Sequence, residues 1–360
     1  MDDQERAGGT VDASVHDLFE QPEDWTEPGL YPVAPGVHRI PLPLPQDGLV
    51  AVNVYAIQTE DELVLVDGGW ALDLSRQRLD AALAGIGRHV RDITRFLITH
   101  VHRDHYTQAV AVRREFSTRI SVGQGERPTL ELLTSGEFRS LGPQHQQLQR
   151  AGADTLLREL ASVGLGPQRK SSQRWEMPDD WLHAPSIIDL ASGPDLEVLH
   201  CPGHTQGHVV FVDRQAKLLF AGDHVLPHIT PSIGYEASPG ELPLNDYLNS
   251  LRMMLDLPDL RLLPAHGPVT TSVHTRVNEL LQHHDDRLEE CIAAVWEGAS
   301  TAYATAKFLN WTRRRRRFED LDPFNRMLAT IETQAHLDVA VAQGCLTRSV
   351  VNDVTHYGVR

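Results

Sequence analysis

The sequence predicts an α/β fold followed by a smaller, mainly helical C-terminal region. Short runs of strand-forming residues alternate with segments of helical periodicity up to about residue 270, and the strand-like runs of the second half resemble those of the first. Beyond Thr270 the periodicity becomes helical. With 360 residues, of which 41% are hydrophobic, the chain can bury the cores of one large and one smaller domain.

The first part of the chain indicates a lead-in and then a meander of strands. Residues 1–30 are acidic and rich in Gly, Pro and Asp without a sustained apolar period, which predicts a flexible segment. The main domain is expected over residues 31–272. Its first strands are predicted at Val37 to Leu42, Ala51 to Gln58 and Leu63 to Val66.

The next segments alternate between helical and strand-like patterns, as in an α/β layer. A helical insert is expected at about residues 126–165, with two amphipathic helices separated near Gly142 and Pro143. The other elements are a helix at Leu74 to Gly87, a strand at Thr94 to Ile98, a helix at Tyr106 to Phe116, and strands at Ile120 to Val122, Leu196 to Leu199, Val209 to Val212 and Leu218 to Phe220.

Residues 273–360 predict a helical, winged-helix-like C-terminal domain. Helices are expected at Val273 to Val295, Thr301 to Leu309 and Phe324 to Ala342, and a hairpin at Cys345 to Tyr357. Three helices and a hairpin are the parts of a winged helix.

Charge and cysteine content narrow the classes of function. The formal net charge of −16 would repel nucleic acid and anionic membranes at long range. The three cysteines are far apart and form no CxxC motif, which favours a reducing compartment. The first residues lack a basic start and an apolar stretch, and no run of about 18 apolar residues occurs. A cytoplasmic protein without membrane contact is expected.

The strongest chemical signal is the segment from Ile98 to His105, in which an apolar strand leads into His100, His102, Asp104 and His105. His100 and His102 are two residues apart at a strand end, so they can point the same way and share one cation. Asp104 and His105 open the next helix and can face a second cation. Zn²⁺ favours this mixture of imidazole nitrogen and carboxylate oxygen.

Three further polar signals follow short apolar strands later in the chain. His204 follows a Pro-Gly turn, Asp223 follows Ala-Gly at the end of an apolar run, and His266 lies between Ala265 and Gly267. Because all of these signals terminate strands, they can converge on one sheet edge.

The motif and the later signals resemble the metallo-β-lactamase superfamily over roughly residues 36 to 270. The resemblance implies an αββα sandwich of two mixed sheets with helices outside. It also implies a first metal bound by His100, His102 and His204, and a second metal bound by Asp104, His105 and His266, with Asp223 bridging the two. Asp67, at the end of an early strand, matches the aspartate that supports the histidines from behind.

The resemblance predicts a dinuclear metallo-hydrolase with two Zn²⁺ ions, although iron or manganese stays open on ligand type. A hydroxide bridging the two cations would attack a small ester, thioester or lactone, as in the glyoxalase-II-like relatives. Asp104 is the candidate that orients this nucleophile and takes its proton. Tyr106, His228 and Tyr235 are candidates to donate a hydrogen bond to a substrate oxygen.

Three alternatives follow from other features. Five consecutive arginines, Arg313 to Arg317, lie next to Trp311 and Phe318 and could bind phosphates, as in the lactamase-β-like endoribonucleases that share a C-terminal tail. The same run could instead be a solvated face or a salt-bridge strip in a homodimer. A persulfide dioxygenase with one iron is the oxidoreductase alternative, and a metal-bearing sensor is the non-enzymatic one.

Overall fold

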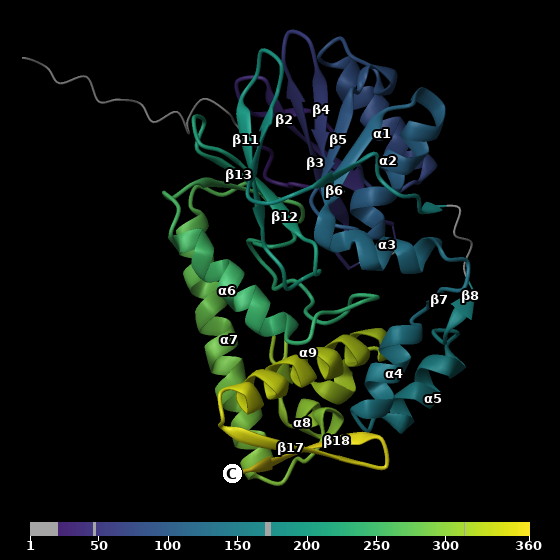
Figure 1. Ribbon diagram of the computed structural model, residues 1–360, viewed down its shortest axis with the longest axis vertical. Helices are drawn as coiled ribbons and strands as arrows, with labels where there is room; N and C mark the ends of the chain where they lie inside the picture. Colours follow the sequence, from purple (N-terminus) through teal and green to yellow (C-terminus); the bar gives the residue numbers. More distant parts are fainter. Residues whose placement is uncertain (1–20, 46–47, 170–173, 313) are drawn as a thin grey trace, which may run out of the picture.

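A computed structural model describes residues 21–45, 48–169, 174–312 and 314–360. Two mixed β-sheets lie face to face, with helices on the outer side of each (Figure 1). The last four strands of the first sheet run parallel to one another, and its other pairs of neighbouring strands are antiparallel. In order across this sheet the strands are β1 (Tyr31–Ala34), β2 (Val37–Pro43), β3 (Ala51–Gln58), β4 (Leu63–Val66), β5 (Arg95–Ile98), β6 (Arg119–Gly123) and β9 (Asp180–Leu182).

The second sheet is antiparallel except for its last pair of strands, which is parallel. Apolar side chains of the two sheets meet between them, among them Tyr55 of the first and Phe220 of the second, whose rings pack edge to face at 5.5 Å. The strands of the second sheet are β10 (Ser186–Asp189), β11 (Asp195–His200), β12 (Val209–Asp213), β13 (Leu218–Gly222) and β14 (Arg261–Pro264).

Helices cover the outer face of each sheet because their apolar sides complete two further cores. Leu83, Ala109 and Leu130 pack on the first sheet, and Leu251 and Leu280 pack on the second. The helices on the first sheet are α1 (Asp73–Ala84), α2 (Arg103–Phe116) and α3 (Arg127–Thr134); those on the second are α6 (Pro243–Leu255) and α7 (Val273–Trp296). The predicted αββα sandwich is therefore confirmed.

The C-terminal part of the chain is mainly helical, and α7 extends from the second sheet into it (Figure 1). Residues of α7, α8 and α9 share one apolar cluster with Tyr357 and Leu346 of the last hairpin. Its elements are α8 (Ala302–Phe308), β15 (Asn310–Trp311), β16 (Arg316–Arg317), α9 (Pro323–Ala342), β17 (Leu346–Val351) and β18 (Val354–Val359). The winged-helix interpretation and the domain boundary near residue 272 stay predictions.

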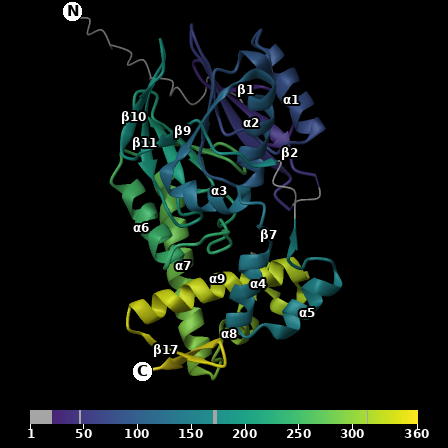
Figure 2. The same ribbon diagram turned by 45° about the vertical axis from the view of Figure 1, so that its right-hand side comes forward.

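The insert is built differently from the expectation of two helices. Three helices form, and the second and third, α4 (Gly142–Arg150) and α5 (Asp154–Ser162), pack on α9 instead of on a sheet (Figure 2). Leu148 and Leu156 contact the same apolar cluster as Met327 and Ile331. A two-stranded antiparallel ribbon is formed by β7 (Arg139–Ser140), which precedes α4, and β8 (Gln168–Arg169), which follows α5.

The predicted lead-in lies mostly outside the described residues. Its described part is anchored, because the Gln21 side chain donates to the Pro32 carbonyl at 2.8 Å and the Trp25 carbonyl accepts from Arg39 at 2.7 Å. Among the described residues, the helices are too short or too polar to cross a membrane.

Candidate metal centre

The structure brings all seven predicted ligands to one edge of the two sheets. They come from the segments that follow four strands, whose C-terminal ends meet at this edge. His100 and His102 follow β5, Asp104 and His105 lie in the first turn of α2, His204 follows β11, Asp223 follows β13, and His266 follows β14.

One group of nitrogens converges from three histidines. The Nδ1 atom of His102 lies 3.0 Å from Nε2 of His100 and 3.0 Å from Nε2 of His204. Imidazole nitrogens at this distance either share a proton or direct their lone pairs at a common cation. Burial and the nearby His204 lower the pKa of His102 to about 3. Burial lowers the pKa of His204 to about 4. Neutral imidazoles with free lone pairs are what a metal requires.

A second group lies beside the first and mixes imidazole with carboxylate. Asp104 Oδ2 lies 3.5 Å from His266 Nε2 and 3.8 Å from His105 Nε2. Burial opposes charge on His105, but Asp67, Asp223 and Asp104 raise its pKa to about 10. In turn, His105 and His266 outweigh burial and hold the pKa of Asp104 well below its usual range. A cation that binds here would displace the proton on the imidazole.

Asp223 faces both groups, one oxygen toward each. Its Oδ2 lies 3.4 Å from His204 Nε2, and its Oδ1 lies 3.4 Å from His266 Nε2 and 3.6 Å from His105 Nε2. The Nε2 atoms of His105 and His266 and Oδ1 of Asp223 are buried without a hydrogen-bond partner among the described residues. Buried polar atoms without partners are costly, so this donor set fits a pair of cations.

Three of the five imidazoles, those of His105, His204 and His266, are oriented through their other ring nitrogen. The Nδ1–H group of His105 donates to Asp67 at 2.8 Å, that of His204 to the Ser232 carbonyl at 2.8 Å, and that of His266 to the Ala51 carbonyl at 2.7 Å. These bonds fix the tautomers that leave Nε2 free toward the centre. Asp67 is therefore placed behind His105, as its predicted supporting role requires.

Asp67 is itself held by the residue that precedes the histidine motif. The backbone N–H of Thr99 donates to Asp67 Oδ1 at 2.8 Å, and the Thr99 hydroxyl donates to both carboxylate oxygens at 3.0 Å. Asp67 has a φ of 63°, in the left-handed region that aspartate tolerates better than most residues. This backbone conformation directs the Asp67 carboxylate back toward β5.

The three predicted substrate-binding residues lie in different surroundings. Tyr106 is fully buried, its hydroxyl donates to the Glu176 carbonyl at 2.8 Å, and its ring stacks on Trp175, so the prediction that it meets a substrate is wrong. In an α-helix, position 106 points away from its neighbour His105, into the core. His228 is exposed, and the Tyr235 ring packs edge to face on Phe324 of α9 at 5.8 Å.

The structure also shows supporting residues outside the predicted set of ligands and Asp67. His208 accepts the backbone N–H of Asp223 at 3.2 Å and stacks on His100 at 4.9 Å. Two buried carboxylates hold the loop after His204: the Thr205 hydroxyl donates to Glu126, and the Gln206 N–H donates to Glu236 at 2.9 Å. Burial raises the pKa of both glutamates. A lone buried glutamate leaves no periodic signal, so the sequence could not single out either one.

Comparison with curated proteins finds metallo-hydrolases. The chain is 24% identical over 323 residues to the "Probable metallo-hydrolase YqjP" of Bacillus subtilis, covering 86% of this chain and 92% of that protein. It is 28% identical over 183 residues to the "Hydroxyacylglutathione hydrolase GloC" of Haemophilus influenzae, covering 49% and 69%. Together with the cluster of histidines and aspartates, these relatives indicate a metallo-hydrolase.

Comparison with solved structures and family models agrees with the fold. The metallo-beta-lactamase family protein TTHA1429 of Thermus thermophilus superposes with a TM-score of 0.69 at 27% identity, covering 91% of this chain and 100% of that one. A beta-lactamase domain protein of Burkholderia ambifaria superposes with a TM-score of 0.72 at 24% identity, covering 96% and 100%. The model of the metallo-beta-lactamase superfamily matches residues 47–266. The chain therefore belongs to the metallo-beta-lactamase superfamily.

Proposed function

We propose that the chain is a dinuclear, zinc-dependent hydrolase of a small ester, thioester or lactone. The observation that carries the proposal is Asp223, whose two oxygens each lie 3.4 Å from a histidine of a different group. A carboxylate so placed suits a bridge between two cations. Two bound cations would supply an acidified water and a polarised substrate oxygen.

Asp104 and His102 define the side from which a substrate approaches. They are the two partly exposed members of the cluster, whereas the other five side chains are buried. Asp104 has a side chain 14% exposed and stays ionised beside His266, so it can accept a hydrogen bond from an attacking water and orient it.

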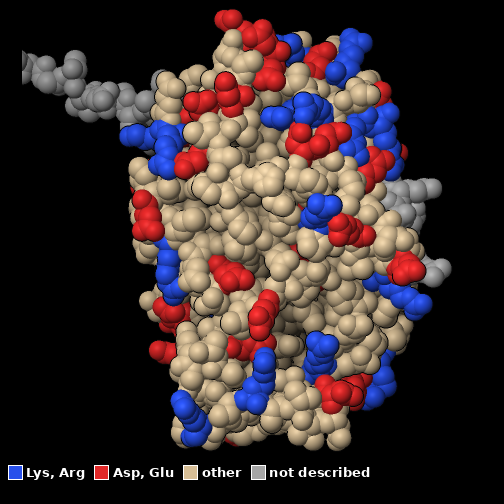
Figure 3. Space-filling view, in the orientation of Figure 1, with Lys and Arg blue, Asp and Glu red and all other residues tan. Residues whose placement is uncertain are grey.

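The class of substrate is supported by the relative whose name is hydroxyacylglutathione hydrolase, because an acyl group carried on the thiol of glutathione is a thioester. Among the alternatives, a dioxygenase with one iron would need only the group of His100, His102 and His204. The second group, which is Asp104, His105 and His266, is also assembled in this chain. On the face seen in Figure 3, basic side chains are scattered among acidic ones, which is a poor surface for a phosphate backbone.

The test combines metal analysis with a substrate panel. Purified protein is expected to hold about two zinc ions per chain and to hydrolyse one class among thioesters, lactones, phosphodiesters and β-lactams. Asp223→Ala should lower the metal content and suppress turnover by about 10²-fold or more. Asp256→Ala should change neither, because Asp256 is exposed at the C-terminal end of α6. One iron per chain with oxygen consumption would overturn the proposal.

A further inference from the structure

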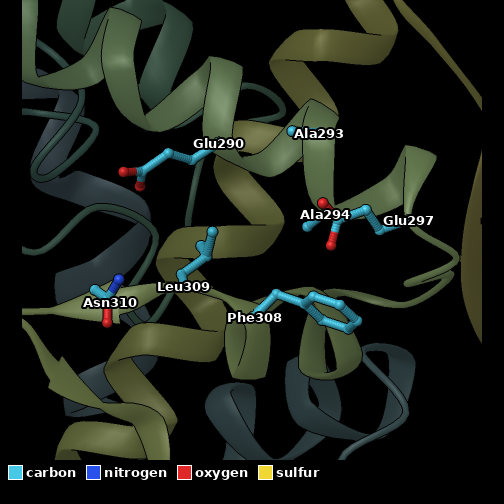
Figure 4. Close-up of a pocket in the computed structure, with 7 residues that line it drawn as sticks. All are labelled: Glu290, Ala293, Ala294, Glu297, Phe308, Leu309 and Asn310. Carbon is cyan, nitrogen blue, oxygen red and sulfur yellow. The ribbon is translucent and has the colours of Figure 1, made fainter.

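An acidic groove lies at the C-terminal end of α7, distant in the fold from the metal centre. The cavity has a volume of about 210 Å³ and is open to solvent. Figure 4 shows Glu290 on α7 and Glu297 directly after the end of this helix, with the Phe308 ring across the opening. Its lining residues are Glu290, Ala293, Ala294, Glu297, Phe308, Leu309 and Asn310.

The groove presents negative charge next to exposed aromatic surface. Glu297 is exposed and makes no ion pair with any described residue, while Glu290 pairs with Arg287 at 2.9 Å. Phe308 is 53% exposed, and Trp296, which precedes Glu297, is 67% exposed. Carboxylates beside an aromatic face fit a guanidinium group, which combines charge with stacking.

Guanidinium groups are carried by the hairpin that starts at the groove. Asn310, which lines the cavity, pairs with Arg317 across β15 and β16, and the turn between these strands carries Arg314 and Arg315. Arg314, Arg315 and Arg316 are exposed and form no ion pair with the described residues. Glu297 and these three arginines therefore lack ion-pair partners among the described residues, and the hairpin that carries the arginines starts at the lining of the groove.

We propose that this surface is a two-fold interface between two copies of the chain, with the arginine turn of each copy seated in the acidic groove of the other. A two-fold axis brings one patch against itself, so a patch with adjacent acidic and basic halves is self-complementary. Trp296 and Phe308 supply the aromatic contacts that commonly dominate such interfaces.

A second copy fits the surface better than a nucleic acid does. A phosphate backbone drawn to Arg314 and Arg315 would also approach Glu290 and Glu297, which would repel it. A second copy instead offers the matching charge at both places. Since the chain carries a net charge of −16, two copies repel at long range, and the arginine turn is the local feature that offsets this repulsion.

Charge reversal tests the proposal in a form that does not depend on catalysis. One variant carries Glu290→Arg and Glu297→Arg, and the other carries Arg314→Glu and Arg315→Glu. Each variant alone places like charges together at both contacts, so we expect its dimer to weaken by at least about a hundredfold. An equimolar mixture restores opposite charges at both contacts and should form a heterodimer. Mass is followed by analytical ultracentrifugation over a range of protein and salt concentrations.

A double variant, Arg91→Glu with Arg252→Glu, is the matched control, because both arginines are exposed and lie elsewhere. It should dimerise like the wild type. A monomeric wild type overturns the proposal, and so do variants that dimerise normally or a mixture that stays monomeric while both variants retain wild-type circular dichroism. Loss of single-stranded oligonucleotide binding on Arg314→Glu and Arg315→Glu, in a monomeric protein, would instead assign the arginines to nucleic acid.

Discussion

Arg39 donates a hydrogen bond from its guanidinium to Asn53 Oδ1 at 2.9 Å, and both side chains are buried in the first sheet. This bond orients the Asn53 amide, whose Nδ2 donates to the carbonyls of Pro264 at 3.0 Å and Gly267 at 2.8 Å. These two carbonyls flank Ala265 and His266. The pair thus fixes the loop that presents His266 to the metal centre, although neither residue touches the site.

Asn53→Ala is expected to loosen this loop. The change removes one hydrogen-bond partner each from the Pro264 carbonyl, the Gly267 carbonyl and the buried Arg39, which should lower the free energy of unfolding by about 2–4 kcal/mol. Affinity for the second metal should fall by roughly 10-fold or more, as for other groups that orient ligands. Denaturant unfolding and chelator competition measure the two effects. Asn249→Ala, at an exposed asparagine, is the control; unchanged affinity in the Asn53 variant would show that the loop holds its shape alone.

Asp67→Asn is expected to weaken metal binding without a large change in shape. Asp67 accepts three donors, the Nδ1–H of His105 and the N–H and hydroxyl of Thr99. An amide of the same size offers only one acceptor oxygen, so its NH₂ group must face one of these donors. Metal affinity should drop by roughly 10- to 100-fold.

Metal stoichiometry after dialysis against a competing chelator checks this expectation. The second metal should be lost before the first, because Asp67 contacts His105 and not His204. Asp189→Asn, at an exposed aspartate of β10, should retain both ions. Equal loss of both ions, or of neither, would argue against an orienting role for Asp67.

The ligand cluster was predictable because its residues follow strands at fixed places in the sequence. His100, His102, Asp104 and His105 lie within six consecutive residues, and His204 and His266 each come after an apolar run, so their convergence required only that the strands end at one edge. Two strands, β3 and β4, begin and end at the predicted residues. Patterns of this kind are local, and local patterns are what a sequence displays.

What the sequence did not show depends on contacts between distant segments. Helix α6 and the short strand β9 were missed, and nothing local indicates that α4 and α5 pack on α9, some 170 residues later. Asn53 bonds to carbonyls more than 200 residues away. Its only local signal is a polar residue within the apolar strand β3, which the periodicity alone does not interpret.

Tyr106→Phe tests whether the Tyr106 hydroxyl takes part in substrate binding. The Tyr106 hydroxyl donates to the Glu176 carbonyl inside the core, so its removal should cost about 1 kcal/mol of stability and leave kcat/KM unchanged. Urea unfolding and steady-state kinetics on the active substrate class measure the two quantities. A drop in kcat/KM of tenfold or more would place the hydroxyl in contact with the reacting groups after all.

Glu236→Gln is expected to change how stability depends on pH. Burial, reinforced by Glu126, raises the pKa of Glu236 to about 8, whereas the unfolded chain has the ordinary value of 4.5. Between these values the folded protein holds a proton that the unfolded chain has released. Since stability falls with pH wherever the folded state binds more protons, this group costs stability progressively from about pH 4.5 to pH 8.

Glutamine has no such proton to lose. Its oxygen can accept from the Gln206 N–H, while its NH₂ group can donate to the Thr129 hydroxyl, which then accepts. The unfolding free energy of the variant relative to wild type should therefore rise between pH 5 and pH 8, by on the order of 1–3 kcal/mol. Urea unfolding of both proteins at several pH values gives this difference, in which pH effects common to the two proteins cancel. Glu60→Gln, at an exposed glutamate, should show no such trend. A difference that is flat or falls with pH would mean that Glu236 is ionised in the folded protein.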